Sequence, residues 1–126
     1  MNRSSFNAER VPYFKLKVIR ADINLKKPLL GRAHLYCTIK YKDKIVTTSL
    51  QKTADFKPVW NEEMIFESAE IPSCVTMEIY DRERIFQDDL IGTATILDRQ
   101  LDKREQEVQI WNVGKLVGKL YICMQA

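Results

Sequence analysis

The sequence predicts one all-β domain, an eight-stranded antiparallel sandwich. Its 126 residues are the usual size of a single domain, and a hydrophobic share of 45% suffices for one core. Apolar residues recur with a period of two in short runs, which is the pattern of strands that bury one face. Polar connections separate about eight such runs, a spacing that is typical of antiparallel sandwiches.

The first three strands are predicted from this alternation. Residues 14–18 alternate apolar side chains with lysines, and residues 35–41 continue the same pattern. The polar turn 42–44 then leads into the β-branched run 45–48, which suits a strand. We therefore expect the second and third strands to form a hairpin, although its turn lacks the favoured Asn-Gly pair.

Five more strands follow. Pro58 cannot donate to a β-ladder and marks the entry to the fourth strand, in which Trp60 is a predicted core residue. Gly92 interrupts a later apolar run, where we expect a bulky neighbour to pack close to the backbone. The runs of these five strands lie at 60–66, 75–79, 90–96, 107–111 and 118–124.

Two segments are predicted to differ from this strand pattern. Asp98 is a suitable N-cap for a single helical turn that ends near Glu105. Residues 1–12 are predicted to be a flexible N-terminal segment, followed by the domain at 13–126.

The start of the chain has no apolar stretch typical of a signal peptide, and no run of about 18 apolar residues suits a transmembrane helix. Any membrane contact is therefore expected to be peripheral.

Charge and chemistry exclude several classes of function. The formal net charge of +3 argues against nucleic-acid binding. The odd set Cys37, Cys74 and Cys123 favours reduced thiols in a cytoplasmic protein over a disulfide framework. His34 is the only histidine, and no nucleophile motif, phosphate loop or zinc-ligand spacing accompanies it. The residues therefore predict a protein that is not an enzyme.

Three motifs occur in order along the predicted strands. Residues 29–36 read Leu-Leu-Gly-Arg-Ala-His-Leu-Tyr, and residues 57–62 read Lys-Pro-Val-Trp-Asn-Glu. Residues 80–84 and 88–92 read Tyr-Asp-Arg-Glu-Arg and Asp-Asp-Leu-Ile-Gly. Together they resemble the C2 domain family over nearly the whole chain.

The resemblance implies an eight-stranded C2-type sandwich with three loops at one end, which in this family commonly bind calcium and then phospholipid headgroups. The family has two topologies related by circular permutation. Little precedes the strand at Phe14, and residues 118–124 supply an additional last strand. The order therefore resembles the type II, phospholipase-like topology.

The resemblance also identifies a residual calcium site. The acids of the family's third loop are matched by Asp81, Glu83 and Asp89, but the two aspartates of its first loop are replaced by Pro28 and His34. Calcium needs six to eight oxygen ligands, so half a set argues against tight binding. The alternative is that Asp81 and Glu83 pair with nearby arginines and shape the loop. We expect no cofactor, or calcium bound only weakly.

Apolar residues beside cations in two of these loops suggest membrane contact without calcium. Exposed apolar tips ringed by positive charge suit an anionic lipid interface. The alternative, equally open, is that Leu29 and Phe86 fold back on the sandwich. The candidate membrane loops contain Leu29, Leu30, Arg32, His34, Arg84, Ile85 and Phe86, with Arg82 as a further cation.

A second candidate surface is basic. In the family that this chain resembles, the outward face of the second to fourth strands can bind phosphoinositides. The corresponding basic face here consists of Lys40, Lys42, Lys44 and Lys52. Each lysine near an anionic membrane contributes about 1 kcal/mol. The alternative is an ordinary solvated strand face, because Asp43 and Asp55 dilute the charge.

Two hypotheses of function follow. The first is a non-catalytic module for peripheral docking on anionic phospholipid membranes, calcium-independent or only weakly calcium-dependent. The second is a protein–protein interaction module that binds no lipid, which the missing first-loop aspartates favour. In both we expect a cytoplasmic domain that is monomeric in isolation and binds no nucleic acid.

Overall fold

The computed structural model describes residues 13–25, 32–68, 74–83, 85–96 and 104–125. All regular secondary structure in these ranges is β, in nine strands whose pairings are all antiparallel. The strands are β1 (Tyr13–Ile23), β2 (Ala33–Tyr41), β3 (Lys44–Thr47), β4 (Gln51–Thr53), β5 (Val59–Glu67), β6 (Val75–Asp81), β7 (Asp89–Ile96), β8 (Gln106–Asn112) and β9 (Lys115–Gln125). The predicted all-β antiparallel fold is confirmed.

Eight of these strands contain the runs found in the sequence, and β4 is additional. Its three residues pair with the start of β2, where Ala33 aligns with Thr53 and Leu35 with Gln51. Three residues are too few to display a period of two, so the sequence pattern cannot reveal such a strand. The predicted helical turn falls largely in 97–103, and the predicted flexible segment is 1–12; both lie outside the described residues.

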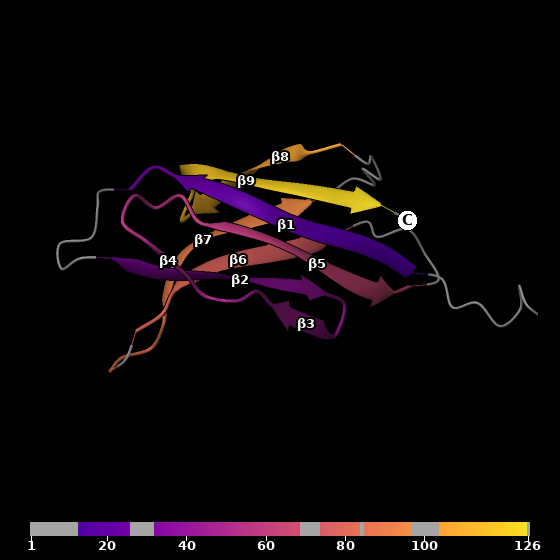
Figure 1. The fold of residues 1–126 in the computed structure, drawn as a ribbon, viewed down its shortest axis with the longest axis horizontal. Coiled ribbons are helices and arrows are strands. Elements are labelled where there is room, and N and C mark those ends of the chain that lie inside the picture. The colour runs from indigo at the N-terminus through magenta and orange to yellow at the C-terminus, as the bar shows by residue number, and fades with distance from the viewer. Residues whose placement is uncertain (1–12, 26–31, 69–73, 84, 97–103, 126) are drawn as a thin grey trace, which may run out of the picture.

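The strands form two layers joined at one point (Figure 1). Hydrogen bonding connects them in the order β3-β2-β6-β7-β8-β9-β1-β5, with β4 also on β2. Between β7 and β8 one aligned pair, Thr93 with Trp111, makes the connection. The first strand lies between β5 and the C-terminal β9. The type II topology remains a prediction from the resemblance.

Aromatic packing closes the core between the layers. Phe14 of β1 stacks on Phe66 of β5, with ring centroids 5.1 Å apart, and meets Tyr41 of β2 edge-on at the same distance. All three side chains are buried. Because β1 and β5 belong to one layer and β2 to the other, these contacts pack the two layers against each other at the end away from the β6–β7 loop.

Gly92 has the close neighbour that the sequence suggested. A Cβ at this position of β7 would lie 2.6 Å from Ile110 Cγ2 of β8 and 3.1 Å from the Trp111 carbonyl oxygen. Such distances leave no room for a side chain, so glycine allows β8 to approach β7 where the two layers join.

Candidate functional site

Several connections meet at one end of the sandwich, which we call the loop end. The start of β2 pairs with the end of β6, where Leu35 aligns with Asp81. The end of β1 pairs with β9 just after the β8–β9 turn, where Ile23 aligns with Gly118. The β6–β7 loop, residues 82–88, and the β8–β9 turn, residues 113–114, therefore lie at the same end (Figure 1).

The base of the β6–β7 loop is tied to β2. The backbone N–H of His34 donates to Asp81 Oδ1 at 2.9 Å, and the backbone N–H of Arg82 donates to the His34 carbonyl oxygen at 2.9 Å. Asp81 therefore uses one carboxylate oxygen to accept from a backbone amide, although the sequence left open a pairing with arginine. The loop leaves the sandwich from a fixed point.

Asp88 fixes the other side of the loop. Its carboxylate accepts from the Tyr36 hydroxyl at 2.5 Å and from the backbone N–H of Glu83 at 2.9 Å. These bonds, the one from Tyr36 first, lower the pKa of Asp88. Burial, followed by the bond to Asp88, raises the pKa of Tyr36 to about 12. The sequence did not indicate this role of Asp88, because the motif draws attention to positions 81, 83 and 89.

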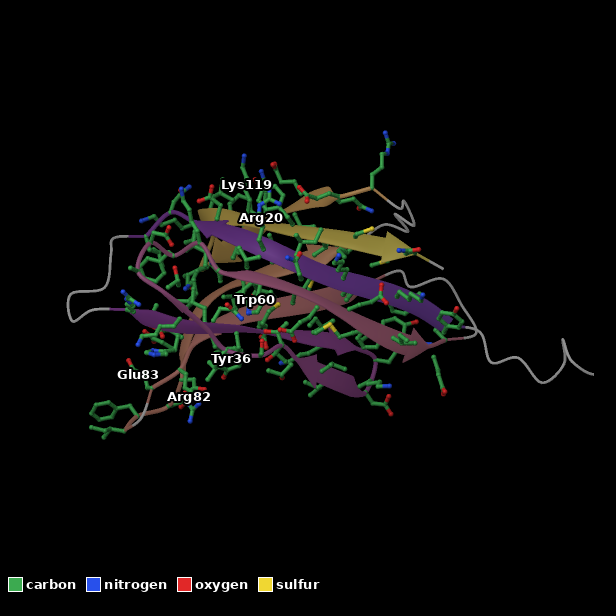
Figure 2. The ribbon with its side chains drawn as sticks, in the orientation of Figure 1. Arg20, Tyr36, Trp60, Arg82, Glu83 and Lys119 are labelled. Carbon is green, nitrogen blue, oxygen red and sulfur yellow. The ribbon has the colours of Figure 1, made fainter. Side chains whose placement is uncertain are left out.

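The tip of the loop is apolar and exposed. Ile85 is 85% exposed and Phe86 78% exposed. Figure 2 shows Arg82 and Glu83 on the segment that projects from the lower left of the molecule. Phe86 therefore points outward and does not fold back on the sandwich.

The other candidate membrane residues are only partly described. Arg32 is exposed and His34 is half-buried at the start of β2. Leu29, Leu30 and Arg84 lie outside the described residues. The structure thus brings Arg32, His34 and the β6–β7 loop to one end.

The acids of the predicted calcium site do not gather into a metal-binding group. Among the described residues, no three His, Cys, Asp or Glu side chains are placed to hold a metal ion. Asp81 accepts a hydrogen bond from the backbone N–H of His34, and Glu83 and Asp89 are exposed. A calcium cage requires converging oxygens, which these three side chains do not present in the described structure; weak calcium binding stays a prediction.

The four lysines of the basic face do not form one patch. Lys40 Nζ lies 2.7 Å from Glu78 Oε1, so its charge is paired, and this bond lowers the pKa of Glu78. Lys42 and Lys44 stand over the rings of Tyr41 and Phe66 at the β2–β3 turn.

Lys52 lies far from the other three lysines. It aligns with His34, six residues before Lys40 on β2, which is about 20 Å at the rise of a strand. Between these positions Tyr36 stacks on Tyr80, with ring centroids 5.4 Å apart. The outward face of β2 and β6 is therefore a network of tyrosines and an ion pair.

The motif at 57–62 shapes a neighbouring loop. Trp60 is buried, as predicted, and its Nε1–H donates to the Ser49 carbonyl oxygen at 3.1 Å. Glu62 accepts from the backbone N–H of Ser49 at 3.1 Å. The backbone N–H of Lys57, just before Pro58, donates to Asp55 Oδ1 at 3.1 Å and closes a turn. These contacts give the motif a structural role.

A second apolar tip lies at the loop end, in the β8–β9 hairpin. Val113 is 99% exposed and has φ 50°, and Gly114 follows with φ 75°. Trp111 and Leu116, which align across the hairpin, are also exposed. The strand pattern did not indicate this tip; the Val-Gly pair between two apolar runs was the available signal.

Comparison with known proteins identifies the family. The C2 domain family model matches residues 13–113. The chain belongs to the C2 domain family. C2 domains are generally non-catalytic modules for membrane or protein interaction, although they also occur within enzymes.

Two curated relatives support this membership. The chain is 32% identical over 98 residues to E3 ubiquitin-protein ligase NEDD4 of Rattus norvegicus, covering 74% of this chain and 11% of that protein. It is 25% identical over 113 residues to multiple C2 and transmembrane domain-containing protein 1 of Homo sapiens, covering 89% of this chain and 11% of that protein. The chain thus spans only a small part of the length of these relatives.

Solved structures show the same fold. A C2 domain of plant extended synaptotagmin 1 superposes with a TM-score of 0.79 at 23% identity, covering 91% of this chain and 93% of that one. The paired C2 domains of extended synaptotagmin 2 give 0.69 at 22% identity, covering 90% and 41%. No helix long and apolar enough to cross a membrane occurs in the described part of this chain.

Proposed function

We propose that this C2 domain docks peripherally on anionic phospholipid membranes from the cytoplasm, with little or no dependence on calcium. The observation that carries the proposal is the exposed pair Ile85 and Phe86 at the tip of a loop whose base is fixed. A fixed base limits the conformational entropy that docking would remove.

Apolar transfer supplies most of the binding free energy in this proposal. Burying a large apolar side chain gains about 1.5–3 kcal/mol, so Ile85 and Phe86 together contribute about 3–6 kcal/mol. A cation near an anionic surface adds about 1 kcal/mol, and Arg82 is exposed beside the tip. Apolar insertion therefore outweighs electrostatic attraction at this loop.

The hydrogen bonds at the loop support weak or absent calcium dependence. Asp81 and Asp88 already accept backbone or hydroxyl donors. Pro28 and His34 supply no carboxylate from the first loop. Calcium would have to take most of its six to eight oxygens from water and lipid.

Vesicle sedimentation tests the proposal. We expect the chain to sediment with phosphatidylcholine–phosphatidylserine vesicles equally in calcium and in chelator, and less with phosphatidylcholine alone. Ile85→Asp combined with Phe86→Asp should weaken binding at least about a hundredfold, because the free energy of burying both apolar side chains in the membrane is lost.

Ile45→Asp is the matched control. Ile45 is 62% exposed on β3, close to the β2–β3 turn and away from the loop end, and this variant should bind as the parent does. Equal binding by the double variant and the parent would refute insertion of the loop. Binding that disappears in chelator would refute calcium independence.

Docking on a protein is the alternative function. It is favoured by Val59 and Ile65, which are exposed on β5, the last strand of the described sheet order. An unpaired strand edge can accept a strand from a partner. No sedimentation with either vesicle, together with a bound protein that Ile65→Asp releases, would replace the membrane proposal with this one.

A further inference from the structure

The β8–β9 hairpin holds a side chain in a conformation that disfavours it. Val113 is β-branched, and its φ of 50° lies in the left-handed region, which such residues rarely adopt. Strained residues of this kind cluster at functional sites. At 99% exposure, Val113 gains nothing from the core in return.

The hairpin that carries Val113 is apolar and has little charge of its own. Trp111 is 45% exposed, and Leu116 opposite it is similarly exposed. Asn112 Nδ2 donates to the carbonyl oxygens of Leu90 and Ile91, which ties the hairpin to the start of β7. Residues 111–118 contain one charged side chain, Lys115, and no carboxylate.

We propose that the β8–β9 hairpin is a second membrane-inserting element, with Val113 in the acyl region and Trp111 at the headgroup level. This inference rests on the proposed function, because it assumes that the loop end faces the bilayer. Its occupant is an anionic phospholipid interface: Lys115 complements the anionic charge, and β7 joins the hairpin directly to the β6–β7 loop.

The spacing along the hairpin suits a membrane interface. Trp111 lies two residues before Val113, which allows at most about 7 Å of backbone between them. Interfacial elements bury their apolar face about 5–10 Å deep, and tryptophan favours the level at which one edge stays hydrated. Val113 can therefore insert while the indole remains at the headgroups.

Tryptophan fluorescence tests the inference. The chain has two tryptophans, and Trp60 is buried with its Nε1–H bonded. Adding phosphatidylserine-containing vesicles with brominated acyl chains should shift the emission of Trp111 to shorter wavelength and quench it. Trp111→Phe should still sediment with the vesicles but show neither change.

The outcomes distinguish this inference from the function on which it rests. Sedimentation of the parent without a change in Trp111 emission would refute insertion of the hairpin and leave docking by the β6–β7 loop intact. Failure to sediment would refute the proposed function, and the inference with it.

Val113→Asn provides an independent measurement. Asparagine tolerates the left-handed conformation, so the variant should fold, while vesicle binding should weaken about tenfold because an apolar side chain is lost. Ile45→Asn, at the other end, should bind as the parent does. Unchanged binding by Val113→Asn, with binding lost in the Ile85→Asp, Phe86→Asp variant, would refute the inference.

Discussion

The β6–β7 loop and the β8–β9 hairpin expose apolar tips at the same end, but they are held in different ways. The loop is held by side chains: Asp81 and Asp88 accept donors from β2 and from the loop itself. The hairpin turns in two residues, Val113 and Gly114, both with positive φ. The difference teaches that carboxylates at a calcium-type loop can accept hydrogen bonds within the protein, whereas the two-residue turn places a β-branched residue, Val113, in a left-handed conformation.

The largest expected effect is a loss of stability from a substitution at Gly118, where the β8–β9 hairpin pairs with β1. In Gly118→Ala the new Cβ would lie 2.4 Å from the Asp22 carbonyl oxygen and 2.9 Å from the Ile23 Cα, both backbone atoms that cannot move aside alone. We expect the free energy of unfolding to fall by about 2–3 kcal/mol, measured by urea denaturation.

Gly92→Ala is the comparison for this prediction. Its Cβ would meet the side-chain atom Ile110 Cγ2 at 2.6 Å, but its nearest backbone atom, the Trp111 carbonyl oxygen, is 3.1 Å away. A side chain can shift more readily than a backbone. The loss should therefore be smaller than for Gly118→Ala. A Gly118→Ala variant within about 0.5 kcal/mol of the parent would show that β1 and β9 separate easily at the hairpin's base.

The next effect is local to the β6–β7 loop. Asp88→Ala removes the acceptor of both the Tyr36 hydroxyl and the Glu83 amide. We expect hydrogen exchange at the Glu83 amide to become at least about tenfold faster, with little change in the β8–β9 hairpin. Tyr36→Phe, which keeps the bond from Glu83, should have a smaller effect. Unchanged exchange in Asp88→Ala would mean that the carboxylate does not hold the loop.

The same bonds predict a dependence on pH. The pKa of Asp88 is held below its ordinary value of about 4, so its contribution is present above that value and is lost as pH falls through the folded-state pKa. The pKa of Tyr36 is raised to about 12. The contribution of its protonated hydroxyl to stability is therefore present below about pH 10 and is lost as pH rises through 12. Hydrogen exchange at the Glu83 amide, corrected for intrinsic rates, should speed up as pH falls through the pKa of Asp88, and this measures the loss at low pH.

The strand pattern was predictable because burial imposes it. Alternation, with the β-branched run at 45–48, located eight strands, Pro58 marked the entry to β5, and Gly92 indicated a close contact. β4 was not predictable, because three residues carry no period and its pairing depends on where the connection from β3 places the chain.

The site was less predictable than the fold. The motif identified the β6–β7 loop, and Ile85 and Phe86 are exposed there. It could not reveal that Asp88 binds Tyr36, since these residues are 52 positions apart and meet only through the pairing of β2 with β6. Likewise, the ion pair of Lys40 depends on register, so a lysine-rich strand does not by itself indicate free charge.

The smallest expected effect on stability is at the hairpin tip. Val113→Asn creates the Asn-Gly pair that two-residue turns with positive φ favour, and it removes the strain of a β-branched residue at φ 50°. We expect a gain of about 1 kcal/mol, which raises Tm by about 4 °C in a domain of this size. Differential scanning calorimetry measures the change.

Gly114→Ala should act in the opposite direction. Its φ is 75°, and nothing lies within 4 Å of the added Cβ, so the expected loss of about 1 kcal/mol comes from backbone conformation alone. If Val113→Asn failed to raise Tm while Gly114→Ala lowered it, the turn would depend on glycine at position 114, and Val113 would be an ordinary turn residue without strain. If both shifts occur, the parent chain loses stability by keeping an apolar side chain at this tip, which a solvent-facing turn does not require.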